Sequence, residues 1–219
     1  MPYQNRVDAV CHRLGDKQMS FQYVFDNATQ ISISKRKNIA QTISRGGVVK
    51  ATSLGAANYE FIVSLPDGPK WSDNRRLIEL VDSLDRTTVD TVQISNPGMS
   101  YIAEYQGDLT NVTGVTVSYT SGNTVTITGG ATLGSGFRFR AGDYIQLGSA
   151  SVYTVVEDVA FNVDTITVHR PIREAVGGYT LKVGTDVSWD IICVSMPTWT
   201  IFGYNQVSWS GEFVFAEAL

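Results

Sequence analysis

One histidine and two nearby acidic residues are the side chains of this sequence best suited to acid–base chemistry. His169 lies in the run TITVHRP, and Glu157 and Asp158 precede it on the same stretch. A carboxylate can hold an imidazole in one tautomer, which would make the histidine a general base. The stretch supplies neither a nucleophile nor a second acid, and His12 lies in an irregular N-terminal segment. We therefore expect no catalytic residues and no enzyme.

The strand that carries His169 favours a structural role instead. Ile166 and Val168 alternate with Thr165, Thr167 and His169. Because successive side chains of a strand point to opposite faces, the two apolar residues face a core and the histidine faces away from it. We expect His169 to occupy an ordinary surface position.

Metal and cofactor sites have little support. The two cysteines, Cys11 and Cys193, lie far apart, and so do the two histidines, His12 and His169. Zinc sites and disulfide frameworks use closer spacings. The sequence also has no glycine-rich loop opening a helix, no Walker motif and no GxSxG elbow. We expect no metal, no cofactor and two free thiols, as in a reducing compartment.

Membrane insertion and secretion are not expected either. No apolar run approaches the roughly 20 residues that span a bilayer. The N-terminal segment MPYQNRVDAVCHRLGDK is polar and mixed, without the apolar core of a signal peptide. We therefore expect no membrane partner.

The charge distribution bears on the class of partner. Charged residues make up 17% of the 219 residues, and the formal net charge is −4. A dedicated nucleic-acid-binding protein presents a strongly basic face, so this balance argues against that class. Segment 31–50 is the exception, with five Lys or Arg and no acid. Lysine on a strand edge discourages unwanted pairing; the functional alternatives are contact with DNA or, favoured in an acidic chain, with an acidic neighbouring subunit.

Alternating apolar and polar residues predict strands in the first half of the chain. The runs are TQISISKRK, QTISRGGVVKAT, NYEFIVSLP and TTVDTVQIS. Gly46 and Gly47 predict a turn between two short strands. In the third run, Tyr59, Phe61 and Val63 fall on one face, so we expect them in a core.

One amphipathic helix is predicted from WSDNRRLIELVDSLDR, residues 71–86. Ser72 or Asp73 can cap it, because their side-chain oxygens accept a hydrogen bond from a first-turn amide. Its apolar stripe consists of Leu77, Leu80, Val81 and Leu84. We expect this helix to pack across one face or end of a sheet.

A denser series of short strands follows. The hairpin GVTVSYTSGNTVTITGG is followed by FRFRAGDYIQLG, SVYTVVEDVA, DTITVHRP and GGYTLKVG. This number and spacing fit a small OB-type barrel or a compact sandwich. An OB-type barrel can bind nucleic acid or oligosaccharide, but acidic residues outnumber basic ones here, which disfavours nucleic acid. Carbohydrate and protein ligands stay open.

The last strands, in VSWDIICVSMPTWTIFGYNQVSWSGEFVFAEAL, need partners from the first half of the chain. The predicted fold is therefore mainly β: a discontinuous β-sandwich domain with one helix, carrying an inserted small OB-like β-barrel. We assign residues 1–30 to an N-terminal arm, residues 31–105 and 184–219 to the sandwich, and residues 106–183 to the insert. Short exposed loops accept such insertions when the ends of the insert lie close together.

This layout resembles the distal tail proteins of long-tailed bacteriophages, in the short form with an OB-type insertion. Three groups of segments carry the resemblance: TQISISKRKNIAQTIS and YEFIVSLP with the helix WSDNRRLIELVDSLDR; FRAGDYIQLGSASVYTVVEDV with DTITVHRP; and GYNQVSWSGEFVFAEAL. The resemblance lies in the order of these segments along the chain. The first thirty residues have no counterpart in this pattern, and we expect an arm that reaches a neighbouring subunit.

The resemblance implies a structural virion protein of the tail tip, made in the host cytoplasm. In that family the sandwich domains pair edge to edge into a hexameric ring that joins the tail tube to the baseplate hub or tail fibre proteins. DNA only passes through the lumen, and the inserts face outward as attachment platforms. A heterologous interface closes into a ring when its rotation permits, and aromatic side chains suit such contacts.

We expect strands 31–34 and 207–215 at or near the subunit interface. The candidate interface residues are Ile31, Ile33, Lys35, Arg36, Lys37, Trp209, Phe213 and Phe215. Two other functions stay open: another phage tail, neck or baseplate component, and a carbohydrate-binding module for host-surface attachment. A glycan hydrolase has the least support.

Overall fold

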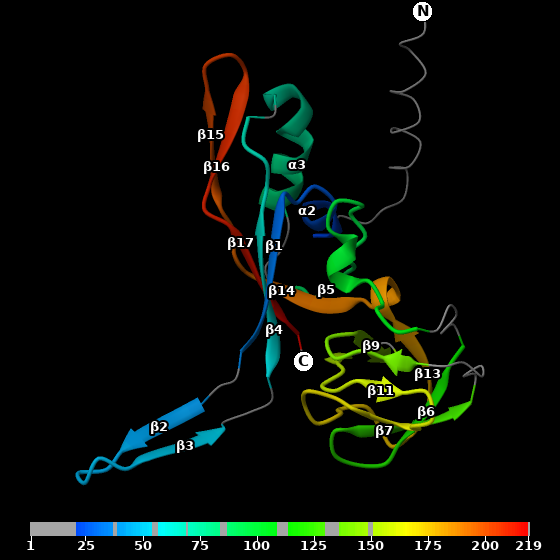
Figure 1. The fold of residues 1–219 in the computed structure, drawn as a ribbon. Helices are drawn as coiled ribbons and strands as arrows, with labels where there is room; N and C mark the ends of the chain where they lie inside the picture. Colours follow the sequence, from blue (N-terminus) through cyan, green and yellow to red (C-terminus); the bar gives the residue numbers. More distant parts are fainter. Residues whose placement is uncertain are drawn as a thin grey trace, which may run out of the picture.

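The computed structural model shows a mainly β protein with several sheets. It describes residues 21–36, 39–53, 57–68, 70–83, 87–108, 114–129, 136–148 and 151–218. The N-terminal segment as far as residue 20, including Cys11 and His12, lies outside the described residues, as does Lys37. The strands fall into one five-stranded sheet, one six-stranded sheet and three two-stranded sheets (Figure 1).

The five-stranded sheet joins segments from the two ends of the described chain. Its order is β1 (Gln30–Arg36), β4 (Asn58–Ser64), β17 (Phe213–Glu217), β14 (Trp189–Ser195) and β5 (Asp90–Val92). All of these pairs are antiparallel. The strand latest in the sequence is therefore the central one, while β1 and β5 form the two edges.

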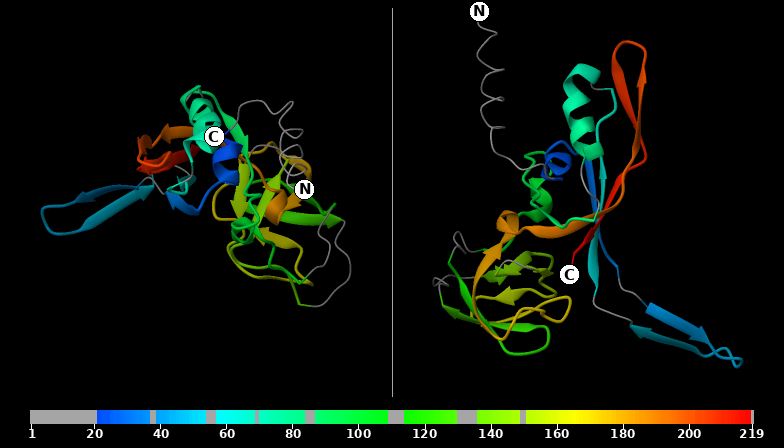
Figure 2. Two further views of the ribbon diagram at one scale, coloured as in Figure 1. Left: turned by 90° about the horizontal axis from the view of Figure 1, so that it is seen from above. Right: turned by 180° about the vertical axis from the view of Figure 1, so that it is seen from behind.

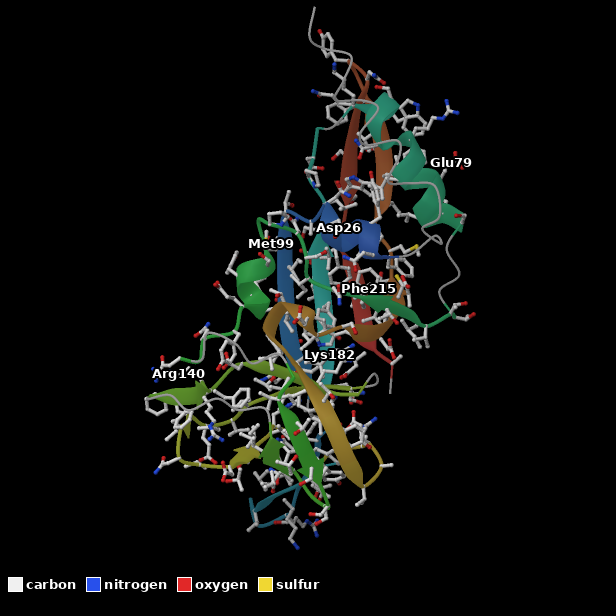
Figure 3. The ribbon with its side chains drawn as sticks, turned by 90° about the vertical axis from the view of Figure 1, so that its right-hand side faces the viewer. Asp26, Glu79, Met99, Arg140, Lys182 and Phe215 are labelled. Carbon is white, nitrogen blue, oxygen red and sulfur yellow. The ribbon has the colours of Figure 1, made fainter. Side chains whose placement is uncertain are left out.

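One face of this sheet packs into the larger of two cores. Tyr59, Phe61 and Val63 alternate with half-buried residues along β4 and are fully buried, which confirms the predicted face. Phe213 and Phe215 from β17 are fully buried beside them. In Figure 3 the Phe215 side chain lies among others in the middle of the molecule.

Residues 21–28, assigned from the sequence to the arm, contribute to this core. Helix α2 (Gln22–Asp26) is short, yet Phe21, Val24 and Phe25 are almost completely buried. Phe21 and Phe25 pack against Phe215, with ring centroids 5.1 and 5.3 Å apart. Hydrophobic periodicity does not reveal this helix, because one helical turn is too short to show a period.

Helix α3 (Trp71–Ser83) covers one end of the same core. Leu77 and Val81 of the predicted stripe are buried, and Ile78 joins them. The side chains of Asp73, Leu80 and Leu84 are not described. Trp71 packs on Trp199, with ring centroids 5.3 Å apart. The predicted helix is therefore confirmed, packed against the end of the sheet as expected.

The six-stranded sheet is drawn from one continuous stretch of the chain. Its order is β10 (Ser151–Thr154), β9 (Tyr144–Leu147), β13 (Gly177–Val183), β6 (Thr116–Tyr119), β7 (Thr124–Gly129) and β12 (Thr165–Thr167). Strands β8 (Phe137–Phe139) and β11 (Val159–Ala160) form a small separate pair. These strands surround the second core, with Val117, Ile145 and Ile166 at its centre.

The turn predicted at residues 121–123 connects β6 and β7. Gly122 has a φ of 82°, in the left-handed region that glycine adopts at no steric cost. This hairpin is therefore confirmed. The sandwich and the closed barrel predicted from the sequence are not confirmed, because the described strands form the separate sheets given above.

The chain enters and leaves the six-stranded unit at one place. The short helices η2 (Ser100–Ala103) and η3 (Gly184–Asp186) flank these two crossings. Gly184 has a φ of 63°, and a Cβ there would lie 3.0 Å from Tyr105. At Gly107 a Cβ would lie 2.3 Å from the Arg138 carbonyl oxygen. Gly184 is thus needed because the two crossing segments lie close together, and Gly107 is needed because it lies against the backbone of β8.

Two hairpins extend from the five-stranded sheet. Strands β2 (Ile39–Ile43) and β3 (Val49–Ser53) form one, and β15 (Thr198–Phe202) and β16 (Gln206–Ser210) form the other. Gly47, at a φ of 79°, lies in the turn predicted at the glycine pair. Figures 1 and 2 show the β2–β3 hairpin projecting on the side opposite the six-stranded sheet.

Candidate functional site

The two sheets meet at a buried ion pair between Arg170 and Glu217. The two guanidinium nitrogens donate to the two carboxylate oxygens at 2.6 and 2.5 Å. The side chains are 1% and 2% exposed. Burial alone would lower the pKa of Arg170, but its hydrogen bonds to Glu217 and the charge of that carboxylate raise the pKa above its ordinary value. The pair holds the end of β17 against the six-stranded unit.

Backbone groups add further hydrogen bonds to this pair. Arg170 also donates to the carbonyl oxygens of Ala57 at 3.0 Å and Val152 at 2.9 Å. Glu217 accepts a bond from the backbone N–H of Tyr59 at 3.1 Å. A buried charge is tolerated when it is paired and hydrogen-bonded on several sides. The arrangement therefore suits a permanent structural contact.

Tyr59 forms the second part of the joint. Its hydroxyl lies 2.5 Å from the Thr154 hydroxyl, across the boundary between the sheets. Burial raises the pKa of Tyr59, and that of Tyr153 on the other side of Arg170. The guanidinium carbon lies 5.5 and 5.2 Å from these two ring centroids, within cation–π range.

Gln146 and Ser188 extend the joint toward β14. The Gln146 side-chain amide donates to the Ser188 carbonyl at 2.9 Å and accepts from the Ser188 backbone N–H at 3.1 Å. Gln146 is completely buried, so this two-way bond satisfies a side chain that water cannot reach. We call the set Tyr59, Gln146, Thr154, Arg170 and Glu217 the inter-sheet joint.

His169 lies beside this joint and not on a free surface as the sequence predicted. Its Nδ1 accepts a hydrogen bond from the Thr154 backbone N–H at 3.0 Å, and its ring centroid is 5.3 Å from that of Tyr59. Asp158 accepts bonds from the Ala141 backbone and from Arg140, which lower its pKa. Glu157 is exposed. Asp158, one of the two carboxylates considered as a partner for His169, is thus bonded to another loop.

Among the described residues, no group of three or more His, Cys, Asp or Glu side chains is arranged to hold a metal ion. Within the same residues, no helix has the length and apolar character needed to cross a bilayer. Cys193 is buried, and its thiol donates to the Ser195 carbonyl oxygen at 3.5 Å.

The predicted interface residues of β1 differ in their surroundings. Ile31 and Ile33 are half-buried and pack against the larger core, whereas Lys35 is exposed. The Arg36 side chain is not described, and Lys37 lies outside the described residues. Among the described strands β1 pairs only with β4, so its other edge offers backbone groups for pairing. The strand is available for pairing, mainly through its backbone.

Trp209, Phe213 and Phe215 are not at the surface. Phe213 and Phe215 are fully buried and Trp209 is 8% exposed. The alternation of β16 and β17 turns these aromatic rings toward the subunit's own core, so they do not contact a neighbour directly. The residues that these strands turn outward are smaller, such as Ser208 and Val214.

The opposite edge of the five-stranded sheet is acidic. Asp90 and Asp190 lie on the paired strands β5 and β14, and Asp26 lies on α2 beside them. Neutral groups donate to them: the backbone N–H of Phe21 to Asp90 at 2.5 Å, and the Thr91 hydroxyl to Asp190 at 2.6 Å. No cation pairs with these three carboxylates among the described residues. The two edges of one sheet thus carry opposite charge, because Lys35 lies on β1 and the basic segment 31–50 includes that strand.

The hairpins expose apolar side chains far from either core. On β2–β3, Ile43 is 74% exposed and Val49 is 58% exposed. At the tip of β15–β16, Tyr204 is 98% exposed and Phe202 is 47% exposed. Among the described residues, β2–β3 contributes nothing to either core, whereas β15–β16 contributes Val207 and Trp209. A two-stranded hairpin without a core is marginal in water, so the apolar surface of β2–β3 gains stability when it is covered.

Sequence reasoning found the basic segment but missed the acidic edge. The three aspartates come from separate parts of the chain, and only the strand order brings them together. The exposed hairpin could have been found, because QTISRGGVVKAT carries isoleucine and valine without a third strand nearby. No protein-family model matches this chain, and none of the curated proteins matches it.

Proposed function

We propose that this protein is a structural subunit of the tail tip of a long-tailed bacteriophage, where copies form a hexameric ring. The ring joins the tail tube to the baseplate or fibre hub, and DNA only passes through its lumen. Residues 31–105 and 184–219 form the ring layer, a discontinuous sandwich. Residues 106–183 form an OB-like barrel that faces outward as an attachment platform. The location in this proposal is the virion.

The observation that carries the proposal is the opposite charge of the two sheet edges. A heterologous interface joins one surface of a subunit to a different surface of the next, and rings arise when that step closes. The basic edge at Lys35 is complementary in this sense to the acidic edge, where Asp90 lies on β5 and Asp190 on the adjoining strand β14. Opposite charges across an interface also fix its register and speed encounter.

The inter-sheet joint supports the outward platform. Because Arg170 and Glu217 lock the two sheets together, a ligand bound on the six-stranded unit would be held in a fixed orientation relative to the ring. A flexible tether between two domains would carry few buried charges. The two separate cores are consistent with the proposed division of the chain.

Sedimentation velocity and negative-stain microscopy of the purified protein test the ring. We expect a closed oligomer with six-fold projections at micromolar concentration. A protein that stays monomeric at high concentration would contradict the proposal. A filament, or a complex that forms only with another tail protein, would favour a different tail, neck or baseplate role. A monomer that binds on a glycan array would favour the carbohydrate-binding alternative.

A pair of charge reversals tests the edges directly. Lys35→Asp and Asp190→Lys each bring like charges together at every interface, so each alone should weaken assembly by about tenfold or more. Mixed in equal amounts, the two variants can alternate around a ring with every contact complementary, and assembly should return. Asp186→Lys makes the same charge change on an exposed residue away from both edges and should assemble normally.

A further inference from the structure

The five-stranded sheet leaves one face open. Figures 1 and 2 show the helices and the six-stranded sheet on the other side. On the open face Val214 pairs with Ile62, and Ala216 pairs with Ile192. All four side chains are only partly exposed, and Val194 beyond them is 58% exposed. An apolar row across the middle of a sheet is the pattern of a face that is covered in use.

The β2–β3 hairpin has one apolar face and one polar face. Ile43 pairs with Val49, and Ile39 lies four residues before Ile43 on the same face. The other face carries Thr42 and Lys50, which also pair with each other. Among the described residues, the members of neither core come from this hairpin. Within the described part of the chain, its apolar face therefore packs into neither core.

The two surfaces are also complementary in charge. The hairpin and the strand leading to it contain Lys or Arg at five positions and no acid between residues 31 and 50. The open face carries Glu60, Asp190 and Glu212 around its apolar row. Opposite charges around an apolar centre match the usual anatomy of a protein interface.

We propose that the β2–β3 hairpin of one copy lies on the open sheet face of the next copy. The Ile39, Ile43 and Val49 side chains would cover the row at Ile62, Val214 and Ile192. The hairpin projects away from its own sheet, which leaves the sheet of a second copy as the matching surface (Figure 2). This inference rests on the proposed ring, and it names the contact that holds neighbouring subunits together.

Two variants, each with a pair of aspartates on one face of the hairpin, test the contact. Ile43→Asp with Val49→Asp should weaken self-assembly at least about tenfold in sedimentation velocity, because it puts charge at the centre of an apolar interface. Thr42→Asp with Thr52→Asp adds the same charge to the polar face and should have a much smaller effect. All four residues are exposed, so thermal unfolding of the monomer should be nearly unchanged in both variants.

A cysteine pair locates the occupied surface. In the variant Ile43→Cys with Ile62→Cys, mild oxidation should give a ladder of covalent oligomers on a non-reducing gel. Ile43→Cys with Tyr204→Cys is the control, and we expect little cross-linking there. A monomer with an internal disulfide would overturn the inference in favour of the chain's own sheet. If the wild-type protein forms rings, the aspartate variants assemble normally and no ladder appears, the inference is overturned while the proposed ring stands. If the wild-type protein is a monomer, the ring itself is refuted.

Discussion

The inter-sheet joint and the β2–β3 hairpin differ in what they bury and what they expose. At the joint, the charges of Arg170 and Glu217 are enclosed, and they are hydrogen-bonded to each other and to neighbouring backbone groups. On the β2–β3 hairpin, apolar side chains face water, and the basic residues lie in a segment, 31–50, that contains no acid. Removing either partner at the joint leaves the other charge buried and unpaired. Covering the hairpin, in contrast, removes apolar surface area from water. The first contact is thus complete within one chain, and the second is completed by another.

The largest effect is expected at the joint. Glu217→Ala leaves Arg170 buried without its counter-charge and should lower the free energy of unfolding by about 3–5 kcal/mol. Replacing both partners, with Arg170→Met and Glu217→Leu, should recover much of that loss. Asp164→Ala breaks the Arg138 pair, in which the carboxylate is 65% exposed, and should cost less than about 1 kcal/mol. Urea unfolding measures all three, and an equal loss in both single variants would contradict the enclosed joint.

Alkaline pH should loosen the same region. Burial raises the pKa of Tyr59 and Tyr153, so both hydroxyls stay protonated in the folded protein above pH about 10, where they ionise in the unfolded chain. The unfolded state then binds fewer protons, and stability falls as pH rises, by up to about 1.4 kcal/mol per pH unit for each tyrosine. Below pH about 10 these groups add no pH dependence. The double variant Tyr59→Phe, Tyr153→Phe should show a shallower decline, and an unchanged slope would refute the assignment.

The neutral part of the joint should matter less. Tyr59→Phe removes the hydroxyl bonded to Thr154 and keeps the ring, so we expect a loss of about 1 kcal/mol. A double-mutant cycle with Thr154→Val isolates the bond between the two hydroxyls. Additive losses in the cycle would mean that the two groups do not interact across the sheets.

The smallest effect on stability should come from the hairpin. Ile43→Ser replaces a side chain that is 74% exposed and should change the free energy of unfolding by no more than about 0.5 kcal/mol. Glu217→Ala, in contrast, should unfold more easily without a specific change in the assembly surfaces. Measuring both unfolding and oligomer size for each variant separates the two regions. If Ile43→Ser lost as much stability as Glu217→Ala, the hairpin would belong to the fold of a single chain.

Local patterns predicted most of the elements. The alternation in NYEFIVSLP identified the buried face of β4, and helical spacing identified α3 with Leu77 and Val81 inside. The turn residues at Gly47 and Gly122 were also found, since each has a positive φ. These features depend on neighbours in the sequence, which is why they could be read from it.

Features made by distant residues could not be predicted in this way. Arg170 and Glu217 meet only because β17 lies at the centre of the first sheet, and no spacing rule connects them. Alternation indicated which residues of β17 share a face but not whether that face is inside, so Phe213 and Phe215 were placed at the interface. The two faces of a strand look alike in sequence when the exposed face is also apolar, as at Val214.

The position of β17 has a consequence for biosynthesis. This strand lies between β4 and β14, yet it is translated after every other strand of its sheet. While a nascent chain lacks it, β4 and β14 have unpaired edges facing each other and Arg170 has no carboxylate. Closure of the sheet must follow its emergence from the ribosome, and contacts so distant in sequence form slowly. Premature pairing of β4 with another chain is therefore the misfolding route that this topology exposes.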